Sequence, residues 1–205
     1  MLDQALQQLP LVAILRGVKP DEVEAVADTL YLEGFRVIEV PLNSPQALDS
    51  IARLARRLPD DALIGAGTVL SADAVRDVQI AGGRLIVMPH ADVAVIRVAK
   101  ARGLACIPGA ATPTEAFAAL QAGADALKLF PAELVTPPVL KAMRAVLPRE
   151  LRLLPVGGIT PETMAPYKQA GAAGFGLGSA LYSPGQTASD VAPRARAFVQ
   201  AWRAL

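Results

Sequence analysis

The chain has 205 residues, enough for one domain with a substantial core and too few to require a second, so we treat residues 1–205 as a single domain. Its formal net charge of +1 argues against nucleic acid or an anionic membrane surface as a partner. No apolar run reaches bilayer length and we find no signal peptide, while one cysteine and one histidine provide neither an internal disulfide nor a Cys/His metal cluster. These features predict a cytoplasmic α/β protein that needs no metal and no cofactor.

In chain order, a short helix is expected before Leu9, and a strand–turn–helix unit then repeats along the sequence. The strands are expected in the apolar runs LVAILRG (11–17), RVIEVPL (36–42), LIGAGTV (63–69), RLIVMP (84–89), LACIPG (104–109), ALKLFP (126–131), RLLPVGG (152–158) and AGFGLGS (173–179). Each run is mostly apolar rather than alternating, which is typical of parallel strands that are covered on both faces.

The segments between these runs are rich in alanine and have helical spacing, as in residues 21–34 and 45–58. Glycines in EGF, AGG, ARG, QAGAD and QAGAA are expected to end helices in a left-handed conformation. Helix starts are expected at Ser44-Pro45, Ser71, Thr112-Pro113, Thr136-Pro137 and Thr160-Pro161, and the last helix from about Ala188.

Eight strands separated by helices predict a (β/α)8 TIM barrel whose bottom is closed by the short N-terminal helix. The length of 205 residues is close to the lower limit of about 200 for this fold. A doubly wound open sheet of six or seven strands is the alternative.

A lysine, Lys128, interrupts the apolar run 126–131. In a barrel, alternate strand residues point inward, so Leu127 and Leu129 should face the helices while Lys128 faces the interior. A buried amine has a lowered pKa, and its neutral form is a nucleophile that can condense with a ketone. The alternative is an incidental lysine at the surface.

Glu39 is placed in the same way between the outward residues Ile38 and Val40. Beside an inward lysine, Glu39 is a candidate general acid/base, although a purely structural buried ion pair is the alternative. Arg16 ends the first strand at the carboxyl end, where barrel enzymes carry their active sites, and is a candidate for binding an anionic group; otherwise it lies on the surface.

Two glycine clusters follow the last two strands. Gly157 and Gly158 lie in PVGGIT, and Gly178 and Ser179 lie in GLGS. Barrels often bind phosphate at these two loops through backbone N–H groups, although tight turns also require glycine. Together these residues predict a Schiff-base enzyme for a phosphorylated keto compound. A phosphate-binding isomerase or epimerase without a covalent lysine, or a phosphate-ligand sensor, remains as an alternative.

The motifs EVPLNSP, LIGAGTVL, PGAATPTEA, ALKLFPA, VGGITPE and GLGSALY resemble the 2-keto-3-deoxy-6-phosphogluconate/galactonate (KDPG/KDPGal, or KHG/KDPG) aldolases, and the likeness covers nearly the whole chain. These are class I aldolases of sugar-acid breakdown. The phosphogluconate branch typically has arginine where this chain has Asn43 and threonine where it has Val156. Both differences are similar to the phosphogalactonate branch.

The resemblance implies a role for each matched position. It implies Lys128 as the Schiff-base lysine, Glu39 as the general acid/base, Arg16, Thr68 and Asn43 near the substrate carboxylate, Phe130 over the pyruvyl group, Val156 as a selector between the two C4 epimers, and Gly157, Gly158, Gly178 and Ser179 at the phosphate. The implied reaction is cleavage of the phosphogalactonate substrate to pyruvate and glyceraldehyde 3-phosphate, in a homotrimer, with phosphogluconate cleavage as the nearest alternative.

Overall fold

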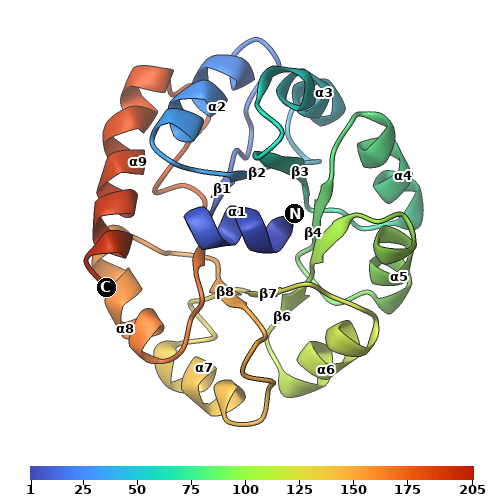
Figure 1. Cartoon of the computed structure of the whole chain (residues 1–205), viewed down its shortest axis with the longest axis vertical. Helices are drawn as coiled ribbons and strands as arrows, with labels where there is room; N and C mark the ends of the chain where they lie inside the picture. Colours follow the sequence, from blue (N-terminus) through green and yellow to red (C-terminus); the bar gives the residue numbers. More distant parts are fainter.

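The computed structural model describes residues 1–205 as a set of parallel strands with helices around them (Figure 1). The strands are β1 (Leu11–Ile14), β2 (Val37–Pro41), β3 (Leu63–Gly67), β4 (Leu85–Val87), β5 (Ala105–Ile107), β6 (Gly109–Ala110), β7 (Leu127–Leu129), β8 (Leu153–Pro155) and β9 (Phe175–Leu177). The helices are α1 (Leu2–Gln8), α2 (Val23–Leu32), α3 (Ala47–Arg57), α4 (Ala72–Ile80), α5 (Val93–Ala101), α6 (Pro113–Gln121), α7 (Pro137–Arg144), the 3₁₀ helix η1 (Pro161–Thr163), α8 (Met164–Gln169) and α9 (Ala188–Arg203).

Every strand pairing is parallel, which confirms the predicted α/β class. Six strands form a curved sheet in the order β5-β4-β3-β2-β1-β9, and three more form a sheet in the order β6-β7-β8. Only Pro108 separates β5 from β6, and a single bridge between Val156 and Gly176 links the end of β8 to β9.

The buried apolar side chains form two separate clusters on the two faces of the strands. The larger cluster lies between the strands and the helices and contains Leu127, Leu129, Ile38 and Val40. The smaller cluster lies on the concave face and contains Leu2, Ala5, Leu6, Val12, Val37, Leu63, Leu85, Val87, Ala105, Ile107, Ala126 and Leu154. The outward prediction for Leu127 and Leu129 is therefore confirmed, because alternate residues of a strand point to opposite faces.

Helix α1 supplies Leu2, Ala5 and Leu6 to the smaller cluster and lies across the middle of the strands in Figure 1. The predicted N-terminal helix is thus confirmed, as is the start of the last helix, since α9 begins at Ala188 with a capping box between Thr187 and Asp190. The five glycines expected to end helices all have positive φ: Gly34, Gly82, Gly103, Gly123 and Gly171.

The helix start predicted at Ser44-Pro45 is wrong. Helix α3 begins at Ala47, with Gln46 as its N-cap in a left-handed conformation. Ser44 is buried, and its Oγ instead accepts a hydrogen bond of 2.9 Å from the backbone N–H of Gly17. The serine accepts from a backbone N–H of the loop after β1 because the loops after β1 and β2 lie together in the fold. The local sequence does not reveal this contact.

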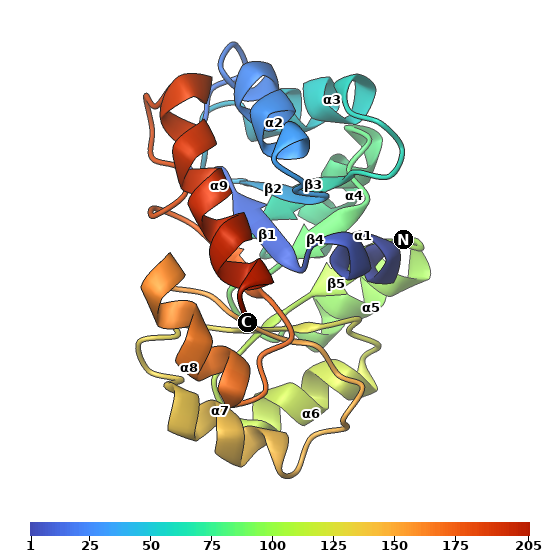
Figure 2. The same ribbon diagram turned by 60° about the vertical axis from the view of Figure 1, so that its left-hand side comes forward.

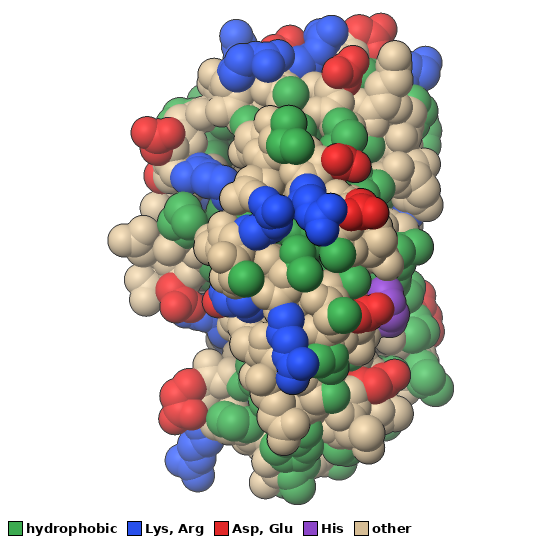
Figure 3. Space-filling view, turned by 90° about the vertical axis from the view of Figure 1, so that its right-hand side faces the viewer, with side chains coloured by type: hydrophobic (Ala, Val, Ile, Leu, Met, Phe, Trp, Pro, Cys, Tyr) green, Lys and Arg blue, Asp and Glu red, His purple; other side chains and the backbone are tan.

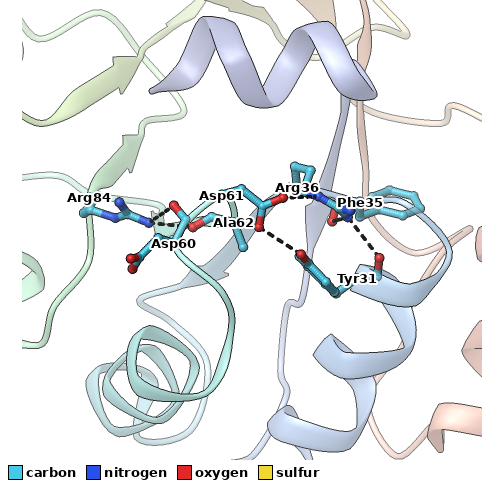
Figure 4. A network of polar contacts seen from close by, with 7 residues as sticks. All are labelled: Tyr31, Phe35, Arg36, Asp60, Asp61, Ala62 and Arg84. Atoms are coloured by element: carbon cyan, nitrogen blue, oxygen red, sulfur yellow. Dashed lines mark hydrogen bonds and ion pairs between the residues drawn. The ribbon is translucent and has the colours of Figure 1, made fainter.

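Paired polar groups occupy the amino ends of the strands below α1 (Figure 4). Asp61 accepts hydrogen bonds from Arg36 Nε and from the Tyr31 hydroxyl, each 2.9 Å long. Arg84 donates to the carbonyl oxygens of Asp60 at 3.0 Å and Ala62 at 2.7 Å. These contacts connect the segments that enter β2, β3 and β4.

On the outside, α2 and α9 lie side by side (Figure 2), so a helix near the start of the chain packs against the last one. The face over α4 and α5 carries basic and acidic side chains interspersed with apolar ones (Figure 3). None of the helices combines the length and apolar character that crossing a membrane requires.

Candidate active site

Lys128 lies at the centre of β7 and points to the concave face. Only 5% of its surface is exposed, and its backbone N–H donates to Pro108 O at 2.9 Å. The inward prediction is confirmed and the surface alternative is wrong. The amine lines a small cavity together with Val12, Ile14, Glu39, Val87, Ile107, Leu154, Val156 and Gly176.

Glu39, from β2, reaches the same cavity from the opposite sheet. Its Oε2 atom is buried and has no hydrogen-bond donor in the protein. The carboxylate makes no direct ion pair with Lys128, so the interpretation of these two residues as a structural salt bridge is not supported. A buried acceptor without a donor costs stability, and a carboxyl group of this kind in a cavity is a candidate for a chemical role.

Burial shifts both titrations toward neutral pH. Desolvation raises the pKa of Glu39 to about 7, although the charges of Lys128 and Arg16 act in the opposite direction. Desolvation also lowers the pKa of Lys128, which the Glu39 carboxylate partly offsets and Arg16 reinforces. The lowered pKa of Lys128 increases the fraction of neutral amine at any given pH, and a carboxyl group with a pKa of about 7 can gain or lose a proton near neutral pH.

Gly67, at the end of β3, makes room for the Glu39 carboxylate and was missed by the sequence analysis. A side-chain carbon built on Gly67 would lie 1.6 Å from Glu39 Oε2. Any larger residue at this position would push the carboxylate out of place. The sequence carries no local signal for this contact, because Glu39 and Gly67 lie on different strands.

A hydrogen-bonded group of three side chains lies beyond the ends of β1, β2 and β3 and consists of Arg16, Asn43 and Thr68. Arg16 Nη1 donates to Asn43 Oδ1 at 2.6 Å, and Nη2 lies 3.5 Å from Thr68 Oγ1. Thr68 has φ +55°, a left-handed conformation that is unusual and strained for a β-branched residue. This group gathers one fixed positive charge with two polar side chains near the Lys128 cavity.

Phe130 follows β7, and the centre of its ring lies 4.6 Å from Lys128 Nζ. The loop that carries it is held at the next buried residue, Ala132. The backbone N–H of Ala132 donates to Val156 O at 2.9 Å, and its carbonyl accepts from the buried Tyr167 hydroxyl at 2.7 Å. Phe130 is thus a partly exposed ring at the edge of the cavity.

The two glycine loops lie next to the cavity, because Val156 and Gly176 line it directly. Gly157 and Gly158 follow Val156, and Gly178 and Ser179 follow β9. The backbone N–H groups of Gly158 and Ser179 donate no hydrogen bond within the protein. Free N–H groups from two adjoining loops are suited to binding an anion. No group of three or more His, Cys, Asp or Glu side chains is arranged to hold a metal ion.

Comparison with known proteins agrees with this geometry. The family model described as KDPG and KHG aldolase matches residues 2–193. The 2-dehydro-3-deoxy-6-phosphogalactonate aldolase of Escherichia coli strain K12 is 48% identical over 196 residues, which cover 96% of each chain.

Two solved structures are informative. A structure described as native KDPGal has a TM-score of 0.94 at 48% identity and covers 96% of both chains. The KDPG aldolase from Legionella pneumophila, with pyruvate captured as a covalent carbinolamine, has a TM-score of 0.81 at 26% identity and covers 100% of this chain and 97% of that one. The chain therefore belongs to the KDPG and KHG aldolase family.

Proposed function

We propose that the chain is a class I aldolase that cleaves 2-dehydro-3-deoxy-6-phosphogalactonate to pyruvate and glyceraldehyde 3-phosphate. The observation that carries this proposal is the pairing of a buried Lys128 with a buried Glu39, with no direct ion pair between them, in one cavity. The family membership and the activity named for the Escherichia coli relative support it.

Lys128 is the proposed nucleophile. Its neutral Nζ attacks the C2 ketone, and proton transfers assisted by Glu39 remove the oxygen as water, leaving a protonated imine. The lowered pKa of Lys128 increases the fraction of free amine. The imine is an electron sink, so it accepts the electron pair of the C3–C4 bond when that bond breaks.

Glu39 is the proposed base for the C4 hydroxyl. Removal of this proton lets C4 leave as the aldehyde, and the resulting enamine takes a proton at C3 before hydrolysis releases pyruvate and the free lysine. A pKa of about 7 allows the same carboxyl group to act in both directions near neutral pH.

The surrounding residues are proposed to bind the two charged ends of the substrate. Arg16, with Asn43 and Thr68, would hold the carboxylate at C1, and Phe130 would pack on the pyruvyl group. The loops of Gly157, Gly158, Gly178 and Ser179 would hold the phosphate through backbone N–H groups.

Val156 is the proposed selector of the C4 epimer. It is buried at the cavity wall and presents methyl groups where the phosphogluconate branch typically has a hydroxyl. The identity of 48% to the phosphogalactonate enzyme of Escherichia coli, against 34% to the phosphogluconate aldolase of Zymomonas mobilis, favours the phosphogalactonate branch.

We also propose that the two sheets close into one eight-stranded barrel. In this arrangement β5 and β6 form a single strand that pairs with β4 on one side and β7 on the other, and the bridge between Val156 and Gly176 closes the ring. The proposed assembly is a homotrimer, as the family resemblance implies.

Borohydride trapping with pyruvate, followed by peptide mass mapping, tests the mechanism. We expect a reduced pyruvyl adduct on Lys128 of the wild type and none in Lys128→Ala. A folded wild-type protein without an adduct would exclude the class I mechanism and favour the non-covalent isomerase or epimerase.

Parallel cleavage assays with the two C4 epimers test the assignment to the phosphogalactonate branch, and equal turnover of both epimers would contradict that assignment.

A further inference from the structure

A carboxylate lies directly against the glycine loop after β8. Glu133 belongs to the segment between β7 and α7, which the two hydrogen bonds of Ala132 fix in place. A side-chain carbon built on Gly157 would lie 2.5 Å from Glu133 Oε2, and one built on Gly158 would lie 3.1 Å from Oε1. The two carboxylate oxygens therefore cover two neighbouring glycines.

This carboxylate has no partner in the protein. Glu133 takes part in no ion pair and accepts no hydrogen bond, although backbone N–H groups of the adjoining loop are free. Glu115 shows the contrast, because its Oε2 accepts from the N–H groups of Ala111 and Thr112, each at 2.9 Å, and closes a capping box. Helix capping thus accounts for Glu115 and does not account for Glu133.

The glycine loops also lack a balancing positive charge. Neither residues 156–160 nor residues 176–180 contain lysine or arginine, so these loops offer an anion only neutral donors, the backbone N–H groups and the hydroxyls of Thr160 and Ser179. A negative side chain on the same glycines acts against their attraction for an anion, because like charges at close range raise the free energy of the bound state.

We infer that Glu133 is a further residue of the site at the phosphate end of the substrate, with a carboxylate that weakens the hold of the glycine loops on a phosphate dianion. This inference rests on the proposed function, which assigns those loops to the phosphate. Its consequence is faster release of a phosphorylated aldehyde, since the product is held by the phosphate end alone after the C3–C4 bond has broken.

The test compares the wild type with Glu133→Gln, which keeps the size of the side chain and removes its charge. Glycerol 3-phosphate is titrated calorimetrically into each protein at low and at high salt. We expect Kd to fall about two- to fivefold in the variant at low salt, the range typical of interactions between exposed charges. The difference should shrink in about 1 M salt, where screening acts over roughly 3 Å.

Glu150→Gln is the matched control. It removes the same charge from an exposed position before β8, at the opposite end of the strands, and its Kd should equal that of the wild type. Thermal melting of each variant reports whether the fold is retained. Pyruvate trapping at Lys128 should be the same in all three proteins, because that reaction does not use the phosphate end.

An unchanged or weaker affinity in Glu133→Gln would overturn the inference, as would a difference that persists at high salt. A wild type that does not bind glycerol 3-phosphate would overturn it as well. None of these results bears on pyruvate trapping, so failure of this inference and failure of the proposed aldolase are separate outcomes.

Discussion

At the amino ends of the strands, Asp61 accepts hydrogen bonds from Arg36 and Tyr31, whereas in the Lys128 cavity the buried Glu39 Oε2 atom has no donor. The first arrangement lies under α1 and connects the segments entering neighbouring strands (Figure 4). The second keeps a buried carboxylate oxygen without a donor, at a cost to stability. Polar groups at the amino ends of the strands therefore stabilise the fold, whereas the unpaired carboxylate at the cavity is available to a substrate.

The largest effect is expected from Lys128→Met, which removes the amine and keeps an apolar side chain of similar length. Cleavage should fall by more than the roughly 10²- to 10⁴-fold that loss of a general base costs, because the covalent route disappears. The melting temperature should stay the same or rise, since burying the amine costs free energy. Lys141→Met, on the exposed side of α7, is the control and should leave both activity and melting unchanged.

Gly67→Ala tests whether the absence of a side chain at residue 67 is needed to accommodate the Glu39 carboxylate. The added carbon would lie 1.6 Å from Glu39 Oε2, so we expect a loss of about 3 kcal/mol in the free energy of unfolding, the upper range for overpacking, together with reduced cleavage. Chemical denaturation of a double-mutant cycle with Glu39→Ala gives the measurement. If the destabilisation persists in the Glu39→Ala background, contact with the carboxylate is not its cause.

Glu39→Gln should change how the stability of the protein depends on pH. The pKa of Glu39 is about 7 in the folded protein against 4.5 in the unfolded chain, so the folded state binds more protons between these values. The free energy of unfolding of the wild type should therefore fall as pH rises through this window, by about 3 kcal/mol in total.

The glutamine variant has no such proton to lose. It should match the wild type near pH 4.5 and exceed it in stability above pH 7, as measured by denaturant titration across this range. Parallel curves for the two proteins would contradict the raised pKa. Glu150→Gln should instead follow the wild type throughout.

The smallest effect is expected at the paired end of the strands. Asp61→Ala removes two hydrogen bonds from a partly exposed carboxylate, so the free energy of unfolding should fall by about 1 kcal/mol. Cleavage by the remaining folded protein should not change, and steady-state kinetics at a temperature well below melting provides the check. A loss of turnover greater than the loss of folded protein would show that this end also serves the reaction.

The sequence predicted those features of the fold and site that depend on local patterns. The two-residue period of strands was sufficient to place Lys128 and Glu39 on the concave face, and glycines with positive φ ended the helices as expected. The last helix, expected from about Ala188, begins at that residue.

Contacts between loops were beyond such patterns. Nothing local distinguishes Ser44, which binds the N–H of Gly17, from a serine that caps a helix. The hydrogen bond between Arg16 and Asn43 and the contact of Glu39 with Gly67 join residues that are distant in the sequence. Each is fixed by the register of parallel strands, which a single sequence leaves open.

Helix α1 has a consequence for the order of folding. Its apolar side chains Leu2, Ala5 and Leu6 pack on a floor that includes Leu154 from β8. During synthesis the first helix therefore emerges long before its docking surface is complete. Its apolar face stays unpaired with Leu154 until about 150 further residues have been made. Contacts of such long sequence separation form slowly, so the packing of α1 on the smaller apolar cluster should be among the last parts of the native structure to assemble.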